Sequence, residues 1–257
     1  VMDFAALTRY SAEGVDLMLS DSTNANNPNF TRSEREVGEA LRQIMMQAKR
    51  KVVVASFSSH IHRIQQVCDA AVEAKRQVAV TGRSMLTNTR IAQELGYLNV
   101  PEGLIVDAFE INDIPPHKLV ILCTGSQGEP LSALARMSVG EHRTVSIERG
   151  DTVIISATPV PGNEKSVTRV INQLSKIGAD VYDKSRGLVH VSGHAGAEEL
   201  KLVLRMVAPK HFMPVHGETV HLMAHARLAE KCGVDPKKIF IIDNGDTLTM
   251  QDHKVRR

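Results

Sequence analysis

Short apolar runs rich in β-branched residues alternate along the chain with amphipathic stretches of helical length. Near-continuous apolar strands separated by helices are typical of a parallel sheet that is covered on both faces. The pattern therefore predicts an α/β fold with a doubly wound, mostly parallel sheet. The expected strands are residues 15–21, 51–57, 77–82, 118–123, 151–157, 188–191 and 211–215.

Helices are expected between these strands, and their starts carry local signals. Thr31 and Glu34 stand three residues apart ahead of an apolar-periodic stretch, which predicts a capping box that opens a helix through about Lys49. Further helices are expected over residues 61–75, 84–98 and 163–177, with two others beginning at Pro130 and near Ala197. We found no internal repeat and no low-complexity segment.

Composition narrows the class of protein only slightly. The 257 residues are 42% hydrophobic and 23% charged, with a net charge of +2, so an RNA partner is neither required nor excluded. Three widely spaced cysteines without a C-x-x-C pair argue against a disulfide framework and favour reduced thiols in the cytoplasm. No apolar run approaches a membrane span, and the N-terminus lacks a signal-peptide pattern.

The segments that follow the expected strands contain the candidate chemistry, because ligands of doubly wound folds bind at the carboxyl ends of the strands. They read SDSTNA, SFSSHIHR, TGRSM, TGSQGEP and SGHAGAEE, which are rich in Ser, Thr, Gly, His and Arg. In Ser192–Gly196, two glycines next to an expected helix start predict outward-pointing amides that bind a phosphate. The alternative is an ordinary strand-to-helix turn, and neither common nucleotide-binding glycine motif is present.

Three groups could form one acid/base and metal-binding edge. Asp21 ends one expected strand, His216 ends another, and His194 lies beside the glycines of the turn. Each has a simpler interpretation, since an Asp before Ser-Thr often caps its own turn and a single His at a strand end is usually structural.

Other histidines and arginines are weaker candidates. His60 and His62 stand two residues apart at the start of an expected helix, where they do not face each other, so they are not expected to bind one zinc ion together. His60 and Arg63 are instead expected to be surface or RNA-contacting groups. Arg83 is a second candidate for RNA phosphate contacts. His221 and His225 lack the glutamate of an H-E-x-x-H motif, and we interpret them as structural.

The run LSDSTNA, ASFSSHIHRIQQV, GRSM, CTGSQGEP, VSGHAGAEE and MPVHGE resembles, in order and spacing, the ribonuclease J family. This is a bacterial family in the β-CASP branch of the metallo-β-lactamase superfamily. The resemblance implies that residues 1–26 are the last part of a first segment of a metallo-β-lactamase αββα fold. Residues 27–190 would form an inserted β-CASP domain, and residues 191–257 would return to the metallo-β-lactamase fold.

The resemblance also implies roles for the residues already singled out. Asp21 matches an acidic motif, His194 matches a motif that helps to protonate or orient at the scissile phosphate, and His216 matches a ligand of a two-zinc site. Ser192, Gly193, His194, Ala195 and Gly196 match the loop that holds an RNA 5′-phosphate, although many relatives carry Ser where this chain has Gly196.

The implied function is zinc-dependent hydrolysis of RNA in decay and processing, both 5′-to-3′ from a 5′-monophosphate and internally. The implied setting is cytoplasmic, with RNA-degradation partners and a homo-oligomeric full-length protein. The family's H-x-H-x-D-H zinc motif is not in this sequence, so we expect a fragment that is inactive alone. Two alternatives are a non-catalytic RNA-binding or interaction module and a nucleotide-binding doubly wound domain.

Overall fold

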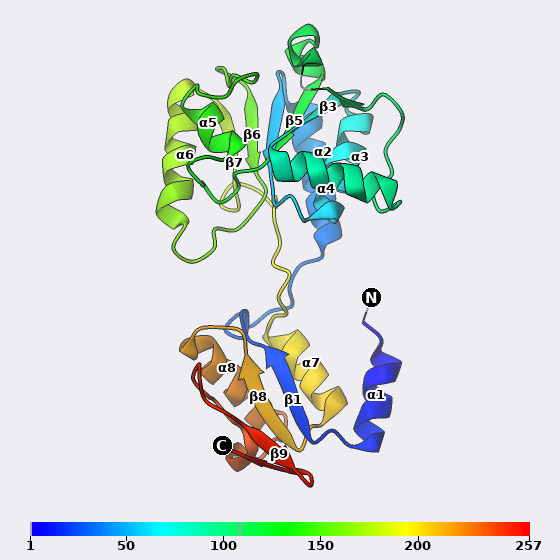
Figure 1. The fold of residues 1–257 in the computed structure, drawn as a ribbon, viewed down its shortest axis with the longest axis vertical. Coiled ribbons are helices and arrows are strands. Elements are labelled where there is room, and N and C mark those ends of the chain that lie inside the picture. Colours follow the sequence, from blue (N-terminus) through cyan, green and yellow to red (C-terminus); the bar gives the residue numbers. More distant parts are fainter. Residues whose placement is uncertain (1, 108) are drawn as a thin grey trace. The chain divides into compact units, whose positions relative to one another are not determined.

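The computed structural model describes residues 2–107 and 109–257, and the chain forms two compact units. The terminal unit combines residues 1–32 with residues 192–257, and the inserted unit is residues 33–191. Figure 1 shows this in colour, since blue elements lie beside yellow, orange and red ones in the terminal unit. Each unit is described separately below.

The inserted unit is built on a six-stranded sheet in which every neighbouring pair is parallel. Its strand order is β4-β3-β5-β2-β6-β7, so strands that follow one another in sequence are often separated in the sheet. The central strands read almost entirely as valine, isoleucine and leucine, because both of their faces are buried. The strands are β2 (Val52–Ala55), β3 (Gln77–Thr81), β4 (Ile105–Val106), β5 (Leu119–Cys123), β6 (Thr152–Ile155) and β7 (Asp180–Tyr182).

Helices cover both faces of this sheet, and the alternation of side chains along each strand decides which helices a residue meets. Val52 and Val54 of β2 belong to one apolar core with α2 (Glu34–Gln47), α3 (Ile61–Glu73) and α4 (Arg83–Glu94). Val53 and Ala55 belong to a second core with α5 (Ala133–Ser138) and α6 (Glu164–Ile177). The unit is therefore a three-layer, doubly wound α/β fold, as the pattern predicted (Figure 1). Two short 3-10 helices, η1 (Glu110–Asp113) and η2 (Pro116–Lys118), precede β5.

The terminal unit is centred on two parallel strands that are distant in sequence. β1 (Leu17–Asp21) pairs with β8 (His211–Val215) in a register that sets Asp21 opposite Val215. Buried Phe212 of β8 joins Leu200 and Leu204 of α7 and Leu228 of α8 in a small apolar core. α1 packs against α7, and a two-stranded hairpin follows near the C-terminus. The remaining bounds are α1 (Phe4–Glu13), α7 (Ala197–Val207), α8 (Thr219–Lys231), η3 (Pro236–Lys238), β9 (Thr249–Gln251) and β10 (Lys254–Arg256).

Three local predictions were wrong, and the first concerns the cap of α2. The capping box of α2 is formed by Ser33 and Glu36 rather than by Thr31 and Glu34: the Ser33 amide donates to Glu36 Oε1 at 3.0 Å. Thr31 instead bonds within the terminal unit, because its amide and hydroxyl find acceptors about 165 residues away in sequence, on Glu199 and His194.

The expected strand over residues 188–191 is also absent, and those residues form an irregular segment. The sheet of the inserted unit ends at β7 (Asp180–Tyr182), and the sequence pattern did not predict this strand. α5 begins at Ala133 instead of Pro130, with Ser132 as its N-cap. In the described part of the chain, no helix is both long and apolar enough to cross a membrane.

Candidate functional site

The parallel register of the terminal unit places Asp21 and His216 side by side. Asp21 is the last residue of β1 and pairs with Val215, so His216 follows β8 at the same end of the sheet. The amide of Ser22 donates to the His216 carbonyl at 3.4 Å, which continues the pairing beyond the strands. Two residues 195 positions apart are thus brought together by backbone hydrogen bonding.

His194 reaches the same place from a loop that two polar side chains hold in position. Asn24 Nδ2 donates to the His194 carbonyl at 2.8 Å and to Ser192 Oγ at 2.9 Å. The Thr31 hydroxyl donates to the same carbonyl at 2.7 Å. The loop that precedes α7 is therefore pinned to the segment that follows β1.

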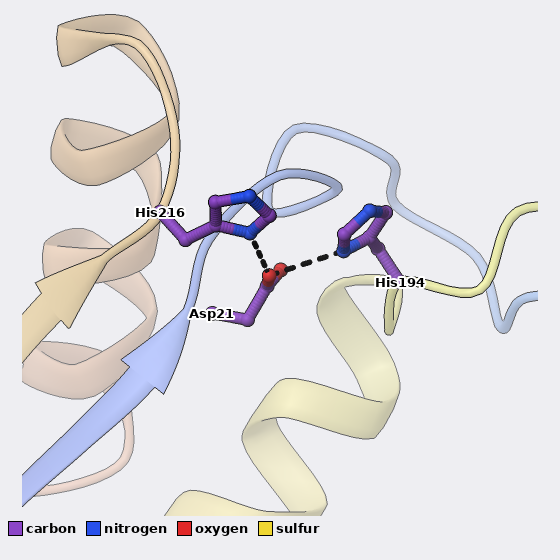
Figure 2. A group of neighbouring side chains, drawn as sticks. All are labelled: Asp21, His194 and His216. Atoms are coloured by element: carbon purple, nitrogen blue, oxygen red, sulfur yellow. Dashed lines mark hydrogen bonds and ion pairs between the residues drawn. The ribbon is translucent and has the colours of Figure 1, made fainter.

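The three side chains meet at one carboxylate oxygen (Figure 2). His194 Nδ1 lies 3.0 Å from Asp21 Oδ2, and His216 Nδ1 hydrogen-bonds to the same oxygen. The two imidazole rings are tilted by 45° with their centroids 5.3 Å apart. All three residues offer a metal-ligand atom within 4.8 Å of the others.

The other oxygen of Asp21 serves the backbone. Asp21 Oδ1 accepts a hydrogen bond from the Thr23 amide at 3.0 Å, which is the local turn cap considered as an alternative for this residue. The cap and the two histidine contacts use different oxygens, so the two interpretations of Asp21 hold together. Thr23 also supports His216, since its hydroxyl lies 3.0 Å from the His216 carbonyl.

The hydrogen-bond pattern decides where the imidazole protons lie. A carboxylate oxygen only accepts hydrogen bonds, so the Nδ1 atoms of His194 and His216 both carry hydrogen. In the neutral rings, each Nε2 then keeps a free lone pair. Burial raises the pKa of Asp21, but hydrogen bonds from His216 and the Thr23 amide and the charge of His194 outweigh it, so the net pKa lies below its ordinary value. Asp21 is therefore an anion that orients two imidazoles.

One residue of this site, His216, has a strained backbone. His216 has φ of 57°, in the left-handed region that a non-glycine residue rarely occupies. Such a conformation costs of order 1–3 kcal/mol and persists where the surroundings enforce it, most often at functional sites. Here the Ser22 and Thr23 contacts to the His216 carbonyl supply that enforcement.

Two family models cover most of the chain. Residues 49–174 match the model described as the ribonuclease J β-CASP domain, and residues 180–241 match that of a Zn-dependent metallo-hydrolase RNA specificity domain. The chain is 46% identical over 243 residues to the ribonuclease J of Mycolicibacterium smegmatis, covering 95% of this chain and 44% of that protein. It is 44% identical over 259 residues to ribonuclease J 1 of Streptococcus pyogenes, covering 100% of this chain and 46% of that protein.

The chain belongs to the ribonuclease J family. A third relative, the ribonuclease J of Thermus thermophilus, is 46% identical over 245 residues, which cover 95% of this chain and 43% of that protein. The chain therefore spans less than half the length of these ribonuclease J relatives. His194 and His216 lie within the segment that matches the metallo-hydrolase model, and that model's description implies zinc as the family's metal.

The loop that was expected to bind phosphate, Ser192–Gly196, differs from the expectation in the state of its backbone amides. Three of its amides already have acceptors: His194 donates to Ser192 Oγ at 3.2 Å, Gly196 to Glu199 Oε2 at 2.8 Å and Ala197 to the Asn27 carbonyl at 2.8 Å. The prediction that these amides point outward, free for an anion, was wrong. The phosphate-binding role of residues 192–196 stays a prediction and has to depend on other donors.

Ser192 is the clearest remaining donor. Its Oγ accepts from Asn24 Nδ2 and from the His194 amide, which uses both acceptor positions of a hydroxyl. The Asn24 amide group cannot be reversed, because its nitrogen also faces the His194 carbonyl. The Ser192 hydrogen is left without an acceptor among the described residues, and the side chain is only half-buried.

Glycine is required at position 196 because the backbone of Asn29 lies close to it, and not because of its dihedral angles. Its φ of −77° and ψ of 173° suit any residue, but a Cβ added here would lie 2.0 Å from the Asn29 carbonyl oxygen. A serine at this position is therefore incompatible with the packing of this chain unless the 27–31 segment moves.

Arg63 was expected on the surface, and the structure corrects this. Its side chain is 0% exposed and lies inside the inserted unit. The guanidinium donates to Glu34 Oε1 at 2.6 Å and to the Val189 carbonyl at 2.8 Å. His60 is the N-cap of α3, accepting from the Arg63 amide at 3.0 Å. Both residues organise the fold, whereas Arg83 is exposed, as expected.

His225 is buried beneath the segment that follows Asp21, which confirms the interpretation of this histidine as structural. It is 0% exposed, packs edge-on against Phe212 with centroids 4.8 Å apart, and its Nδ1 lies 3.0 Å from Ser22 Oγ. Burial lowers the pKa of His225 to about 4, so the ring is neutral. Sequence reasoning missed Asn24 and Thr23 because their partners lie 168 to 193 residues away and no local pattern marks them.

Proposed function

We propose that this chain acts in zinc-dependent hydrolysis of RNA phosphodiester bonds, during RNA decay and processing in the cytoplasm. The proposal includes cleavage 5′-to-3′ from a 5′-monophosphate end as well as internal cleavage, and two zinc ions in the complete site. Residues 1–26 and 191–257 are assigned to the metallo-β-lactamase fold, and residues 27–190 to the β-CASP domain. The observation that carries the proposal is the cluster of Asp21, His194 and His216 (Figure 2).

His216 is the residue of this chain assigned to zinc. Its Nδ1 is bonded to the Asp21 carboxylate, which leaves Nε2 as the ligand atom. A carboxylate behind a metal-binding imidazole fixes the tautomer and raises the basicity of the ligand nitrogen. Zinc, when bound, supplies Lewis-acid activation of water and of a phosphoryl oxygen. His216 fits this metal, because imidazole nitrogen is an ordinary zinc ligand.

His194 is assigned to proton transfer or orientation at the scissile phosphate. Asp21 holds its Nδ1 at 3.0 Å, so the opposite nitrogen, Nε2, is the one available to a phosphate oxygen. The pinned carbonyl of His194 prevents the loop from carrying the ring away. A carboxylate–imidazole pair of this kind orients the ring and fixes which nitrogen carries the hydrogen.

Ser192, Gly193, His194, Ala195 and Gly196 are assigned to the RNA 5′-phosphate. The free hydroxyl hydrogen of Ser192 and the imidazole of His194 support this assignment. Two glutamates in the first turn of α7 weigh against a purely electrostatic site, although Glu199 is engaged by the Gly196 amide. The loop would therefore recognise a phosphate by directed hydrogen bonds more than by the helix dipole.

The H-x-H-x-D-H motif is not present in this sequence, so by this proposal the chain supplies one zinc ligand. We therefore propose that the chain alone binds zinc weakly and does not hydrolyse RNA. RNA-degradation partners and a homo-oligomeric full-length protein also belong to the proposal. The alternative is a non-catalytic RNA-binding module, which would use the same loop without the metal.

The test uses one short labelled RNA carrying either a 5′-monophosphate or a 5′-hydroxyl, with zinc or manganese added. We expect tighter binding of the 5′-monophosphate form, loss of that preference in His194→Ala, and no cleavage. His117→Ala is the matched control, because His117 is exposed in the inserted unit. Equal binding of the two RNAs would refute the phosphate-reading role. Cleavage by the chain alone would refute its proposed inactivity.

A further inference from the structure

The inserted unit contains a cavity of about 530 Å³, and Arg83, the candidate for RNA phosphate contacts, is the one lining residue considered above. It opens where β3 and β5 end, which are neighbouring strands of the parallel sheet. The carboxyl ends of such strands are the usual ligand position in doubly wound folds, and the volume lies in the range of small-molecule sites. Its polar lining is contributed by Thr81, Arg83, Ser84, Thr124, Arg136 and His142.

The lining carries positive charge that no carboxylate of the described residues offsets. The Arg83 side chain makes no hydrogen bond or ion pair with another residue in the described part of the chain. Among the described residues, the Arg136 guanidinium donates to the Glu141 backbone carbonyl alone, at 3.1 Å. None of the lining residues is acidic. Two arginines facing one cavity without acidic neighbours favour an anion with several oxygens, and phosphate matches the guanidinium geometry best.

A buried hydroxyl hydrogen also lacks an acceptor there. His142 Nδ1 accepts from the Val145 amide at 3.2 Å, so the hydrogen of the neutral ring lies on Nε2. That Nε2 lies 3.2 Å from Thr81 Oγ1 and donates to it. The Thr81 hydroxyl, in a residue only 9% exposed, keeps its own hydrogen without an acceptor among the described residues.

The start of α4 adds backbone donors to the same cavity. Gly82 is its N-cap and provides no side-chain cap, so the first amides of the helix have no partner within it. Gly82 has φ of +100°, and a Cβ there would lie 2.7 Å from Thr124 Oγ1. Glycine therefore lets the start of α4 approach the end of β5 closely enough to share one cavity.

We propose that this cavity binds the phosphate group of a nucleotide, through Arg83, Arg136, the Thr81 hydroxyl and the first amides of α4. A phosphate alone is small for about 530 Å³. Leu131, which is 90% exposed on the lining, offers an apolar surface to the attached nucleoside. The choice of a nucleotide rests on the proposed RNA-directed function, whereas the anion site rests on the cavity alone. The phosphate can belong to a free mononucleotide or to a phosphodiester of bound RNA.

The test is a nuclear magnetic resonance titration of the ¹⁵N-labelled chain with uridine 5′-monophosphate, inorganic phosphate or a 5′-hydroxyl oligouridylate. We expect saturable shifts of the Arg83, Ser84 and Met85 amides. Arg83→Gln should weaken the binding about tenfold, since it removes a charged hydrogen-bond donor. Arg90→Gln is the matched control, because Arg90 lies on the same helix outside the cavity lining and makes only a weak contact to Glu94 at 3.8 Å.

Shifts with the monophosphate or inorganic phosphate assign the site to free phosphate ligands, and shifts with the oligouridylate alone assign it to RNA. No shift with any of the three, or equal weakening by Arg83→Gln and Arg90→Gln, overturns the inference. The amides of Gly193 and Ala195 report separately on the proposed 5′-phosphate loop in the terminal unit. If the Gly193 and Ala195 amides shift and the amides of residues 83–85 do not, the proposed function stands and the cavity site is refuted.

Discussion

Replacing Arg63 with methionine should destabilise the inserted unit rather than weaken RNA binding. The guanidinium is fully buried and joins three segments: Glu34 at the start of α2, Ser156 after β6 and the Val189 carbonyl. Burial lowers the pKa of Arg63, and the hydrogen bond and charge of Glu34 act against that shift. Methionine keeps much of the apolar stem but removes every donor.

The structure sets the size of the effect. Removing one partner of a buried ion pair costs about 3–5 kcal/mol, because the other charge is left unpaired. Glu34 keeps 29% of its side chain exposed, so water can partly replace the guanidinium. The Val189 carbonyl also keeps a hydrogen bond from Ser156 Oγ at 2.7 Å. Both features place the expected loss near the lower end, about 3 kcal/mol.

The assay measures the free energy of unfolding in urea. Native-state hydrogen exchange of the β2 and β6 amides then reports on the inserted unit separately. The double variant Arg63→Met/Glu34→Leu should be more stable than the single variant, since it removes both charges together. Arg90→Met is the control: its side chain is 73% exposed, so the change should stay within about 0.5 kcal/mol. A loss below about 1 kcal/mol in Arg63→Met, together with weaker RNA binding, would refute this reasoning.

Three further predictions concern the terminal unit. Gly196→Ala brings a Cβ to 2.0 Å from the Asn29 carbonyl and should cost about 1–3 kcal/mol in thermal unfolding, whereas Gly193→Ala, with open space around it, should cost little. Neutral buried His225, with its pKa near 4 against an ordinary 6.5, contributes stability that is complete above pH 6.5 and falls as the pH drops toward 4. The total fall is about 3 kcal/mol, so His225→Leu should flatten the pH dependence of urea midpoints, and an unchanged slope would contradict the assignment. Ser192→Ala should lower affinity for 5′-monophosphate RNA about tenfold and leave 5′-hydroxyl RNA unaffected, measured by fluorescence anisotropy.

Local interactions explain why some elements were predictable. β2 reads Val52–Ala55 with every residue buried, and both faces of such a strand need cover, so the pattern alone predicts a central parallel strand. α6 was predicted to within one residue, because Gly178 ends it in the left-handed conformation. The α2 cap was mistaken because two overlapping candidates, Thr31 with Glu34 and Ser33 with Glu36, have the same spacing.

Arg63 shows the limit of local reasoning most clearly. Its neighbours His60 and His62 suggested a polar surface turn, but burial of an arginine depends on whether acceptors from other segments surround it. Those acceptors lie 29 to 126 residues away. The prediction of a strand over residues 188–191 failed for a related reason. The apolar residues of this segment pack into the core, but no neighbouring strand pairs with it.

By itself, the sequence determined the α/β class, the central strands, most helices and the candidacy of Asp21, His194 and His216, since these depend on periodicity and on residue type. Only the tertiary structure decided that the three side chains meet at one carboxylate oxygen, and that Asn24 and Thr31 hold the loop that carries His194. It also decided that the His194, Gly196 and Ala197 amides already have acceptors and that Arg63 is buried. The meeting of the three side chains, the support of the His194 loop and the burial of Arg63 depend on partners far apart in the chain, and no local pattern of apolar and polar residues encodes such distances.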